Sequence, residues 1–431
     1  MTMQPSGLHA SATEDAAFAR FTKPPEGFRC RSCGSERVGV FLDLGLMPPS
    51  DALRRPDQLD QPENKYPLDT AICHDCALVQ ITQTVPPEEL FSKDYVYYSS
   101  FSDALLAHSR KNVEALIASR ALGPQSLVIE LASNDGYLLQ FYQKRGIPVQ
   151  GIDPAEGQAK TANERGIPTL CDFFGEALGK SLRAQGRVAD VVHANNVLAH
   201  VADTNGFVAG LAHILKDDGV GVLEFPYLRD LVQKCEFDTI YHEHLCYFSV
   251  TALIPLFRRH GLYLNEVKHV DIHGGSLRVY VGKQESPGPS VEAFLTREQH
   301  EGLDRPSHFA DFAGRVREVK ETLLTLVKRL KGEGKRLAAY GAAAKGTILL
   351  NYVGLGTDLI AFVVDRNVHK HGRYMPGVHV PIKPVETLLQ EQPDYTLILP
   401  WNFKDEILGQ QAEYRARGGK FIVPIPSPVI V

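Results

Sequence analysis

The stretch Val128-Ile-Glu-Leu-Ala-Ser-Asn-Asp-Gly136 decides the fold. Its apolar half is typical of a strand that ends in the carboxylate Glu130, and a turn of small residues leads into a helix that opens at Tyr137. Such a turn lets backbone N–H groups and the N-terminus of a helix approach a ligand closely. The stretch therefore predicts a strand, a ligand-binding turn and a helix of an open α/β sheet.

Strand-like and helical patterns alternate on both sides of this turn. A helical pattern at 104–122 is followed by strand-like runs at 127–131, 149–152, 188–193 and 219–225. A charged helical stretch at 309–331 is followed by a second series, at 336–340, 359–364, 396–399 and 420–423. Strands that alternate with helices imply parallel sheets built from right-handed crossovers. The fold class is therefore α/β, with two Rossmann-like domains.

Composition and charge exclude several classes of protein. The net charge of −5 gives no general attraction to nucleic acid, which needs a basic surface. The sequence has no apolar run of the roughly 18 residues that a membrane helix needs, and its polar start lacks the apolar core of a secretory signal. We expect a cytoplasmic protein with a small-molecule substrate, and a monomer or weak homodimer.

Four of the seven cysteines form two tight pairs, Cys30-Arg-Ser-Cys33 and Cys73-His-Asp-Cys76. Four thiolates on two turns match tetrahedral zinc in a reducing compartment, and a site closed by four thiolates is structural. The metal ligands expected are Cys30, Cys33, Cys73 and Cys76. Four free thiols, a redox dithiol or replacement of one cysteine by His74 remain alternatives.

A second carboxylate follows the next strand, in Gly151-Ile-Asp153-Pro154, and suits the hydroxyl groups of a ribose. The turn lacks G-x-G-x-x-G; instead, Glu130-x-Ala-x-Asn-x-Gly136 resembles the first motif of class I methyltransferases, which implies S-adenosylmethionine as the cofactor. Asp172 and Phe173 would then lie at the adenine. The cofactor-binding residues expected are Glu130, Ala132, Ser133, Asn134, Asp135, Gly136, Tyr137, Asp153, Pro154, Asp172, Phe173, Asn195 and Asn196. The alternative is a strand, turn and helix without a ligand.

Further motifs extend the resemblance over nearly the whole chain. They are Tyr95-Val-Tyr-Tyr-Ser-Ser100, Asn196-Val-Leu-Ala-His200, Phe237-Asp-Thr-Ile-Tyr-His-Glu-His244, Gly274-Gly-Ser-Leu-Arg278, Tyr340-Gly-Ala-Ala-Ala-Lys-Gly346 and Gly372-Arg-Tyr-Met-Pro-Gly377. With the cysteine pairs, they resemble the sugar C-methyltransferase family of deoxysugar biosynthesis. One departure is Ala132, where the family usually has glycine, because alanine disfavours a positive φ.

The resemblance implies methylation of the carbon next to the ketone of a nucleotide-linked 4-keto-deoxysugar, through an enolate. It assigns the general base to His244, a hydrogen bond to the oxyanion to Tyr241, and an orienting or polarising role to Glu243. His200 is the second candidate for the base. Tyr95 and Tyr97 are expected to close the pocket.

Small residues and a lysine at a helix start, as in the motif that ends at Gly346, suit a diphosphate. The substrate-binding residues expected are Tyr97, Tyr98, Ser99, Phe225, His242, Gly275, Ser276, Arg278, Ala344, Lys345, Gly346, Asp365 and Arg373. A nicotinamide site is the competing interpretation of the last domain. His242 and His244 could instead form a second metal site, although the spacing is not H-E-x-x-H. His269 and His273 are expected to be structural.

The predicted divisions are a frayed lead-in at 1–27, a zinc-binding domain at 28–90, a methyltransferase domain at 91–290 and a substrate-binding Rossmann-like domain at 291–431. Two other functions remain open. One is C-methylation of a non-sugar ketone or activated carbon in secondary metabolism. The other is a zinc-ribbon binding protein without catalytic activity.

Overall fold

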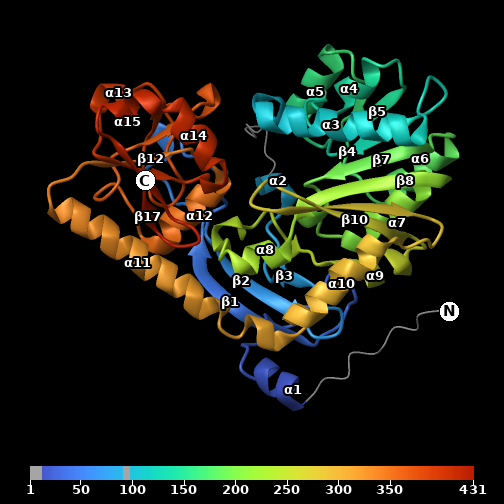
Figure 1. Ribbon diagram of the computed structural model, residues 1–431, viewed down its shortest axis with the longest axis horizontal. Helices are drawn as coiled ribbons and strands as arrows, with labels where there is room; N and C mark the ends of the chain where they lie inside the picture. Colours follow the sequence, from blue (N-terminus) through green and yellow to red (C-terminus); the bar gives the residue numbers. More distant parts are fainter. Residues whose placement is uncertain (1–11, 91–97) are drawn as a thin grey trace.

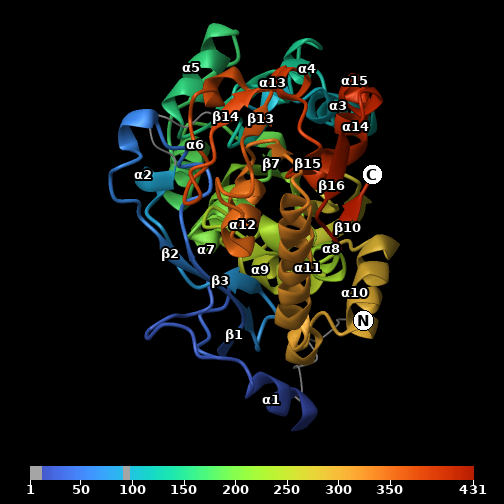
Figure 2. The same ribbon diagram turned by 90° about the vertical axis from the view of Figure 1, so that its left-hand side faces the viewer.

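The computed structural model describes residues 12–90 and 98–431, which form three sheets. Two α/β domains stand side by side, and the N-terminal sheet lies below and between them (Figure 1). The view turned by 90° places the same sheet below the C-terminal domain (Figure 2). The helices and strands of the three parts therefore meet around one central region.

The N-terminal sheet has four strands in the order β1-β2-β3-β9. The strands are β1 (Val38–Met47), β2 (Tyr66–Cys73), β3 (Val79–Ile81) and β9 (Cys246–Tyr247). All neighbours are antiparallel, and β9 comes from a segment far along the chain. Two short helices belong to this part, α1 (Ala12–Phe18) and α2 (Pro87–Leu90). The sheet is thus completed by a strand that lies between elements of the middle domain.

The middle domain has a seven-stranded sheet in the order β10-β11-β8-β7-β4-β5-β6. Its strands are β4 (Val128–Leu131), β5 (Val149–Ile152), β6 (Thr169–Leu170), β7 (Ala189–Asn195), β8 (Leu215–Pro226), β10 (Tyr263–Val270) and β11 (Ser276–Gly282). Five neighbouring strands, β8, β7, β4, β5 and β6, run parallel to one another. Strand β11 is antiparallel to both β8 and β10. This order, with one antiparallel strand near the edge, is that of the class I methyltransferase sheet.

Helices cover both faces of this sheet (Figure 1). They are α3 (Asp103–Arg120), α4 (Leu139–Gln143), α5 (Glu156–Glu164), α6 (Glu176–Ala184), α7 (Thr204–Ile214), α8 (Leu228–Gln233), α9 (Val250–Arg259) and α10 (Pro289–Glu301). Short 3₁₀ turns at η2 (Ser99–Phe101), η3 (Leu198–His200) and η4 (Phe237–Thr239) lie in the loops. Because α10 packs on α9 and β10, it extends the middle domain beyond residue 290.

The C-terminal domain has a six-stranded sheet in the order β14-β13-β12-β15-β16-β17. Its strands are β12 (Leu337–Tyr340), β13 (Val363–Asp365), β14 (Ile382–Pro384), β15 (Tyr395–Ile398), β16 (Lys420–Val423) and β17 (Val429–Ile430). Its helices are α12 (Ala344–Val353), α13 (Thr387–Glu391), α14 (Lys404–Gln410) and α15 (Ala412–Ala416). Helix α11 (Phe312–Gly332) leads into this domain and packs on β1 and α12.

The predicted elements agree with the structure except at their ends, but seven strands were not predicted. The predicted strand at 149–152 coincides with β5, and that at 420–423 coincides with β16. The helix after the cofactor turn begins at Leu139 rather than at Tyr137. The strands that were not predicted are β2, β6, β9, β10, β11, β14 and β17. In the part of the chain that the structure describes, no helix has both the length and the apolar character to span a bilayer.

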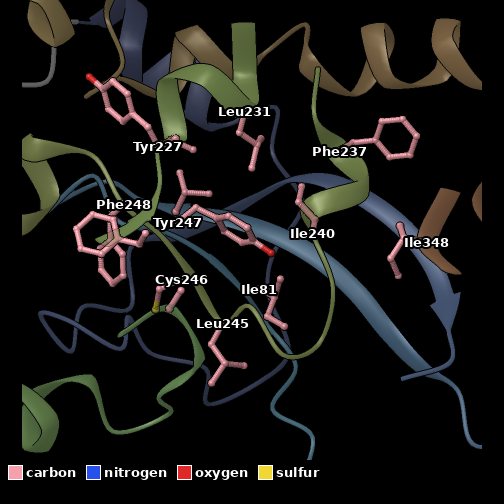
Figure 3. Packing of buried hydrophobic residues seen from close by; sticks show 14 of the residues in the cluster. Ile81, Tyr227, Leu231, Phe237, Ile240, Leu245, Cys246, Tyr247, Phe248 and Ile348 are labelled. Carbon is pink, nitrogen blue, oxygen red and sulfur yellow. The ribbon is translucent and has the colours of Figure 1, made fainter. Parts of the chain in front are cut away.

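Apolar side chains from all three parts pack together where the parts meet. Figure 3 shows Ile81 of β3 next to the segment from Leu245 to Phe248. Phe237 of η4 and Ile348 of α12 lie nearby. Ile81, Phe237, Phe248 and Ile348 are each 0% exposed. The burial is apolar and continuous, so the three parts share one core.

We predict that Ile81→Ala lowers the free energy of unfolding by about 2–5 kcal/mol, because the deleted methyl groups leave a cavity in a closed core. Ile81→Val should lower it by about 1 kcal/mol. Denaturant unfolding of purified variants measures both. Ile430→Ala, at a side chain that is 40% exposed, is the control and should change stability little. Equal stability of Ile81→Ala and the wild type would contradict the shared core.

Candidate active site and metal centre

The four paired cysteines converge at one point. Their sulfur atoms all lie within 4.8 Å of one another. Cys30 Sγ lies 3.5 Å from Cys76 Sγ, and Cys33 Sγ lies 3.5 Å from Cys73 Sγ. Four thiolates at zinc–sulfur distances of about 2.3 Å would be spaced similarly. The set therefore fits a structural zinc ion in number, chemistry and spacing.

The backbone presents both cysteine pairs in the same way. The Gly34 N–H donates to the Cys30 carbonyl at 2.9 Å, and the Ala77 N–H donates to the Cys73 carbonyl at 2.9 Å. Gly34 and Ala77 both have positive φ, at 73° and 58°. His74 points elsewhere, since its ring packs on Phe18 at a centroid distance of 5.0 Å. The four sulfur atoms, without His74, thus form the metal centre.

The metal centre is tied directly to the middle domain. The side-chain amide of Asn205 in α7 donates to the carbonyls of Arg31 and Ser32, at 2.8 and 2.9 Å. At the other end of the lobe, the Ile81 N–H donates to the Leu245 carbonyl at 3.0 Å, where β3 joins β9. The Leu245 N–H in turn donates to the Ala199 carbonyl at 2.7 Å. The backbone that follows His244 is therefore held from both sides.

The turn after β4 has the left-handed backbone of a ligand-binding loop. Ala132, Asn134 and Gly136 have φ values of 55°, 50° and 78°. Ala132 adopts the conformation that glycine would favour, at a cost of about 1–2 kcal/mol. At Gly136 a Cβ atom would lie 2.4 Å from Ile167 Cδ1, so no other residue fits. The alanine therefore leaves the loop geometry intact.

Buried polar atoms without partners surround this turn. Neither oxygen of Glu130 accepts a hydrogen bond of ordinary geometry, and Ser133 Oγ, Asp135 Oδ1 and Asn195 Oδ1 are likewise unpaired among the described residues. Burial, with the nearby Asp153 and Asp135, raises the pKa of Glu130 well above its usual value, although the Tyr137 hydroxyl opposes this. Orphaned acceptors at the carboxyl end of a parallel sheet fit the ammonium and hydroxyl groups of S-adenosylmethionine.

The other predicted cofactor residues lie around the same edge of the sheet. Asp153 accepts backbone N–H groups of Asn134 at 2.8 Å and Ala155 at 2.9 Å, and burial raises its pKa. Pro154 follows it and is half-buried. Asp172 is exposed and the Phe173 side chain is 56% exposed, so both lie at the rim. The N–H of Asn196, at φ 51°, donates to the Glu224 carbonyl at 2.7 Å.

The segment that begins at Tyr98 braces the cofactor turn. The Ser99 N–H donates to Asn134 Oδ1 at 2.9 Å, and the Ser100 hydroxyl donates to Asp135. Tyr98 lies across from His369 of the C-terminal domain, with ring centroids 6.3 Å apart. Tyr95 and Tyr97, predicted to close the pocket, lie outside the described residues.

His244 is held at both ring nitrogens. Its Nδ1 lies 2.9 Å from the Thr239 carbonyl, and its Nε2 lies 2.7 Å from the Tyr241 hydroxyl. Because a carbonyl only accepts, Nδ1 carries the proton. Burial, with His200, Lys345 and His273, lowers the pKa of His244 well below its usual value. The ring is therefore neutral, and Nε2 carries the lone pair that the Tyr241 O–H donates to.

His200 and Lys345 complete the surroundings of this imidazole. The His200 ring packs edge-on to His244 at a centroid distance of 4.7 Å, and burial lowers the His200 pKa to about 4. The Lys345 ammonium donates to Asn402 Oδ1 at 2.9 Å and lies 4.5 Å from the centre of the Trp401 ring. The structure thus brings residues of the middle and C-terminal domains together around His244.

Glu243 and His242 have other neighbours than His244 does. The Glu243 carboxyl group lines a cavity of about 170 Å³ together with Asp51 and Arg373. Burial and then Asp51 raise the pKa of Glu243 well above its usual value, against the opposing charge of Lys370. His242 Nε2 lies 3.2 Å from the Pro67 carbonyl in β2. Among the described residues, His242 and His244 share no metal-binding group.

The predicted substrate residues of the middle domain are mostly internal. Phe225 is fully buried against Phe248, with ring centroids 5.1 Å apart. The Arg278 guanidinium donates to Glu224 Oε1 at 2.5 Å and lies 2.9 Å from His108 Nε2. Gly275, at φ 132°, and Ser276, whose hydroxyl donates to the Ile272 carbonyl, shape the loop before β11.

In the C-terminal domain the predicted motif forms the start of α12. Ala344 is the first residue of the helix, and Gly346 packs so closely on Leu399 that a Cβ atom would lie 2.8 Å from its Cδ1. Asp365, at the end of β13, accepts the Ala342 and Asn367 N–H groups, each at 2.7 Å. The turn before α12 is therefore built like the cofactor turn of the middle domain.

Comparison with known proteins identifies the family. Family models match three parts of the chain: a putative zinc binding domain at 30–91, a methyltransferase domain at 106–267 and a C-methyltransferase C-terminal domain at 271–426. C-methyltransferase NovU of Streptomyces niveus is 34% identical over 405 residues, which are 93% of this chain and 96% of the relative. The chain belongs to the C-methyltransferase family. It is an S-adenosylmethionine-dependent methyltransferase with a structural zinc centre, as the motifs predicted.

Solved structures resemble part of this C-methyltransferase. Magnesium protoporphyrin IX methyltransferase (ChlM) of Synechocystis PCC 6803, with bound SAM, is 15% identical at a TM-score of 0.32, covering 42% of this chain and 82% of that one. The PH0226 protein of Pyrococcus horikoshii OT3 is 12% identical at a TM-score of 0.35, covering 47% of this chain and all of that one.

Several groups near His244 were not among the site residues predicted from the sequence. They are the Thr239 carbonyl, Glu236, Asp238, Trp401, Asn402 and His273. The Trp401 indole donates to Asp238 Oδ2 at 2.8 Å, which joins the C-terminal domain to the turn before His244. Asp238 and Thr239 lie inside the predicted motif that begins at Phe237, and Glu236 precedes it, so their place in the sequence was a usable signal, whereas Asn402 had none.

We predict that Cys30→Ser reduces bound zinc and lowers the thermal midpoint, while affinity for S-adenosylmethionine changes little. The lost ligand weakens folding of the lobe, and the cofactor turn lies in another sheet. Zinc content by metal analysis, a thermal scan and calorimetric titration test this. Cys171→Ser, at the exposed cysteine, is the matched control. A stable Cys30→Ser protein without zinc would contradict the structural assignment.

We also predict an acid-dependent loss of stability from His193. This residue is 0% exposed, and burial lowers its pKa to about 3. Because the unfolded histidine binds a proton near pH 6.5 and the folded one does not, stability falls as the pH drops from about 6.5 towards 3, by at most about 1.4 kcal/mol per unit. Denaturant unfolding between pH 7 and 4.5 should show a shallower slope in His193→Gln. An unchanged slope would contradict a neutral His193.

Proposed function

We propose that this C-methyltransferase methylates the carbon next to the ketone of a nucleotide-linked 4-keto-deoxysugar. The observation that carries the proposal is the state of the His244 ring. The ring is neutral, the Thr239 carbonyl fixes its proton on Nδ1, and Nε2 carries the lone pair. A carbon next to a ketone is acidic enough for an imidazole base, because the carbanion delocalises into an enolate. Methylation of such a carbon through an enolate needs a base, which Nε2 of His244 would supply.

The cations of the C-terminal domain support a nucleotide-linked acceptor. Lys345 stands at the N-terminus of α12, and Arg373 lines the neighbouring cavity. Burial lowers the pKa of Lys345, but Asp238 and Glu236 oppose the shift and favour its charged form. A diphosphate at this helix start would have both the ammonium and the backbone N–H groups as donors. The sugar would then extend from the C-terminal domain towards His244.

Proton transfer would rearrange the His244–Tyr241 pair. As Nε2 takes the proton from the acceptor carbon, it can no longer accept from the Tyr241 hydroxyl. That O–H is then released to donate to the oxyanion that develops on the ketone oxygen. In this scheme the carbon–hydrogen bond breaks, its electron pair moves into the enolate, and the imidazolium holds the proton. His200, edge-on to the ring, keeps water from the base.

The cofactor and the metal have separate parts in this scheme. Glu130, Asn134 and Asp153 would hold S-adenosylmethionine, which supplies an electrophilic methyl group when bound. The four cysteines would hold zinc, which takes no part in the proton transfer and stabilises the lobe that carries β3. A thiolate–zinc centre suits a reducing compartment, which supports the cytoplasm as location. A monomer or weak homodimer remains part of the proposal.

We predict that His244→Asn abolishes deuterium exchange at the acceptor carbon. Without the imidazole, the acceptor carbon has no base to take its proton, and the loss should be at least about 100-fold. Nuclear magnetic resonance follows the exchange in heavy water, with nucleotide-linked 4-keto-deoxysugars as acceptors.

The control for this experiment is His213→Asn, at a histidine on α7 whose Nε2 lies 3.8 Å from Glu176 Oε1. It should exchange and methylate as the wild type does. Both variants should bind S-adenosylmethionine normally. Exchange at the wild-type rate in His244→Asn would remove this residue from the role of base, and inactivity of the wild type on every keto-sugar would overturn the proposed acceptor.

A further inference from the structure

The loop between β10 and β11, at 271–275, lies beyond the carboxyl edge of the methyltransferase sheet. Ser276, the first residue of β11, pairs with Pro226 at the end of β8 and with Val270 at the end of β10. The side of a parallel sheet where its strands end is where ligands of this fold gather. The loop is therefore placed to contact the acceptor, although the sequence analysis treated its histidine as structural.

The backbone of this loop is forced into an unusual shape. His273 has φ 57°, and Gly274 and Gly275 follow at 99° and 132°. At Gly274 a Cβ atom would lie 2.7 Å from Glu236 Oε2, so the loop packs on the turn that leads to Thr239. A left-handed histidine costs roughly 1–3 kcal/mol, and such strain persists where the surroundings fix it. The same turn thus supports both His244 and the loop of His273.

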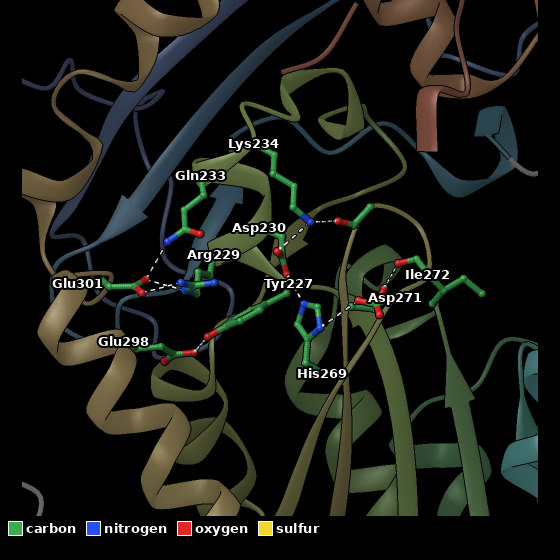
Figure 4. A network of polar contacts seen from close by, with 12 residues as sticks. Tyr227, Arg229, Asp230, Gln233, Lys234, His269, Asp271, Ile272, Glu298 and Glu301 are labelled. Carbon is green, nitrogen blue, oxygen red and sulfur yellow. Dashed lines mark hydrogen bonds and ion pairs between the residues drawn. The ribbon is translucent and has the colours of Figure 1, made fainter. Parts of the chain in front are cut away.

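A network of charges fixes the loop from behind (Figure 4). Asp230 lies 3.0 Å from the Lys234 ammonium and 2.7 Å from His269 Nε2. Lys234 also donates to the Gly274 carbonyl, and the Gly275 carbonyl accepts the Tyr227 N–H at 3.0 Å. These contacts bind the loop through its backbone and leave the His273 ring out of the network.

The loop of His273 packs on Glu236, in the turn that also holds His244 through the Thr239 carbonyl. After burial, the positive charge of Lys345 helps to lower the pKa of both His244 and His273, and His273 also helps to lower the pKa of His244. Burial first, and then Lys345, lower the pKa of His273 to about 4, so the ring is neutral. No hydrogen bond joins its nitrogens to any residue that the structure describes, whereas His244 and His269 are both engaged. A half-buried neutral imidazole with a spare N–H is a hydrogen-bond donor without an acceptor.

We propose that His273 is a catalytic residue that donates a hydrogen bond to the ketone oxygen of the acceptor. The assignment rests on the proposed function, which requires a donor at that oxygen. Before proton transfer the single proton of the Tyr241 hydroxyl is given to His244, so another group must polarise the ketone. A neutral imidazole held neutral by its surroundings performs this task in other enolising enzymes. His273 keeps its own proton, and none is transferred to or from it.

The test compares His273→Asn with the wild type, because asparagine tolerates a left-handed backbone and removes the imidazole. The matched control is His379→Asn: His379 is also left-handed, at φ 51°, but its ring contacts Glu63 in the N-terminal part. With a nucleotide-linked 4-keto-deoxysugar that the wild type methylates, kcat and the rate of deuterium exchange should both fall about 100-fold in His273→Asn.

Affinity for S-adenosylmethionine and the thermal midpoint should stay at wild-type values in His273→Asn, and His379→Asn should keep its kcat. Wild-type exchange and methylation in His273→Asn would overturn the role of His273 and leave the proposed function standing. A loss of activity that is matched by loss of cofactor affinity or of stability would also overturn it, because the histidine would then be structural. A wild type that methylates no keto-sugar overturns the proposed function and this inference with it.

Discussion

The reaction proposed for this protein depends on how one imidazole, that of His244, is held. The Thr239 carbonyl accepts from Nδ1 of His244 at 2.9 Å, and the Tyr241 hydroxyl lies 2.7 Å from Nε2. These two contacts fix the tautomer, the orientation of the ring and the nitrogen that carries the lone pair. Burial keeps the ring neutral. In the proposed reaction, an imidazole that is already neutral and oriented can accept a proton from carbon without first losing one of its own.

All three parts of the chain contribute to this arrangement. The zinc lobe pairs β3 with β9 directly after His244, and the middle domain supports the same backbone through the Ala199 carbonyl. The C-terminal domain reaches the turn before His244 through the hydrogen bond from Trp401 to Asp238. A structural zinc ion contributes roughly 10–16 kcal/mol to the folding of small domains. That energy makes a lobe with few strands rigid enough to position the segment that follows His244.

Local patterns in the sequence predicted much of the fold and part of the site. The cysteine pairs, the cofactor turn and strand β5 depend on neighbouring residues, and the structure has them where they were expected. Strand β9 was missed because two residues carry no periodic signal and their partner β3 is more than 160 residues away in the chain. Long-range pairings of this kind depend on the packing of whole domains, which a single sequence does not specify.

The same limit explains the side chains at the site. Glu243 and His244 are neighbours in the motif, yet one faces Asp51 and the other faces His200. Lys345 was predicted from the helix start, but its approach to His244 follows from the docking of two domains. His273 was expected to be structural, because the role now proposed for it depends on a loop whose backbone is held by Lys234, which pairs with Asp230. The type of a residue alone does not predict in which direction its side chain points or which residue the side chain contacts.

Nitrogen-15 magnetic resonance of histidine-labelled protein tests the central claim most directly, with His244→Asn used to assign the signal. The arrangement described here predicts a neutral His244 at pH 6, with the proton on Nδ1 and a hydrogen-bonded lone pair on Nε2. A His244 signal that titrates near pH 6.5, or one with the proton on Nε2, would contradict it.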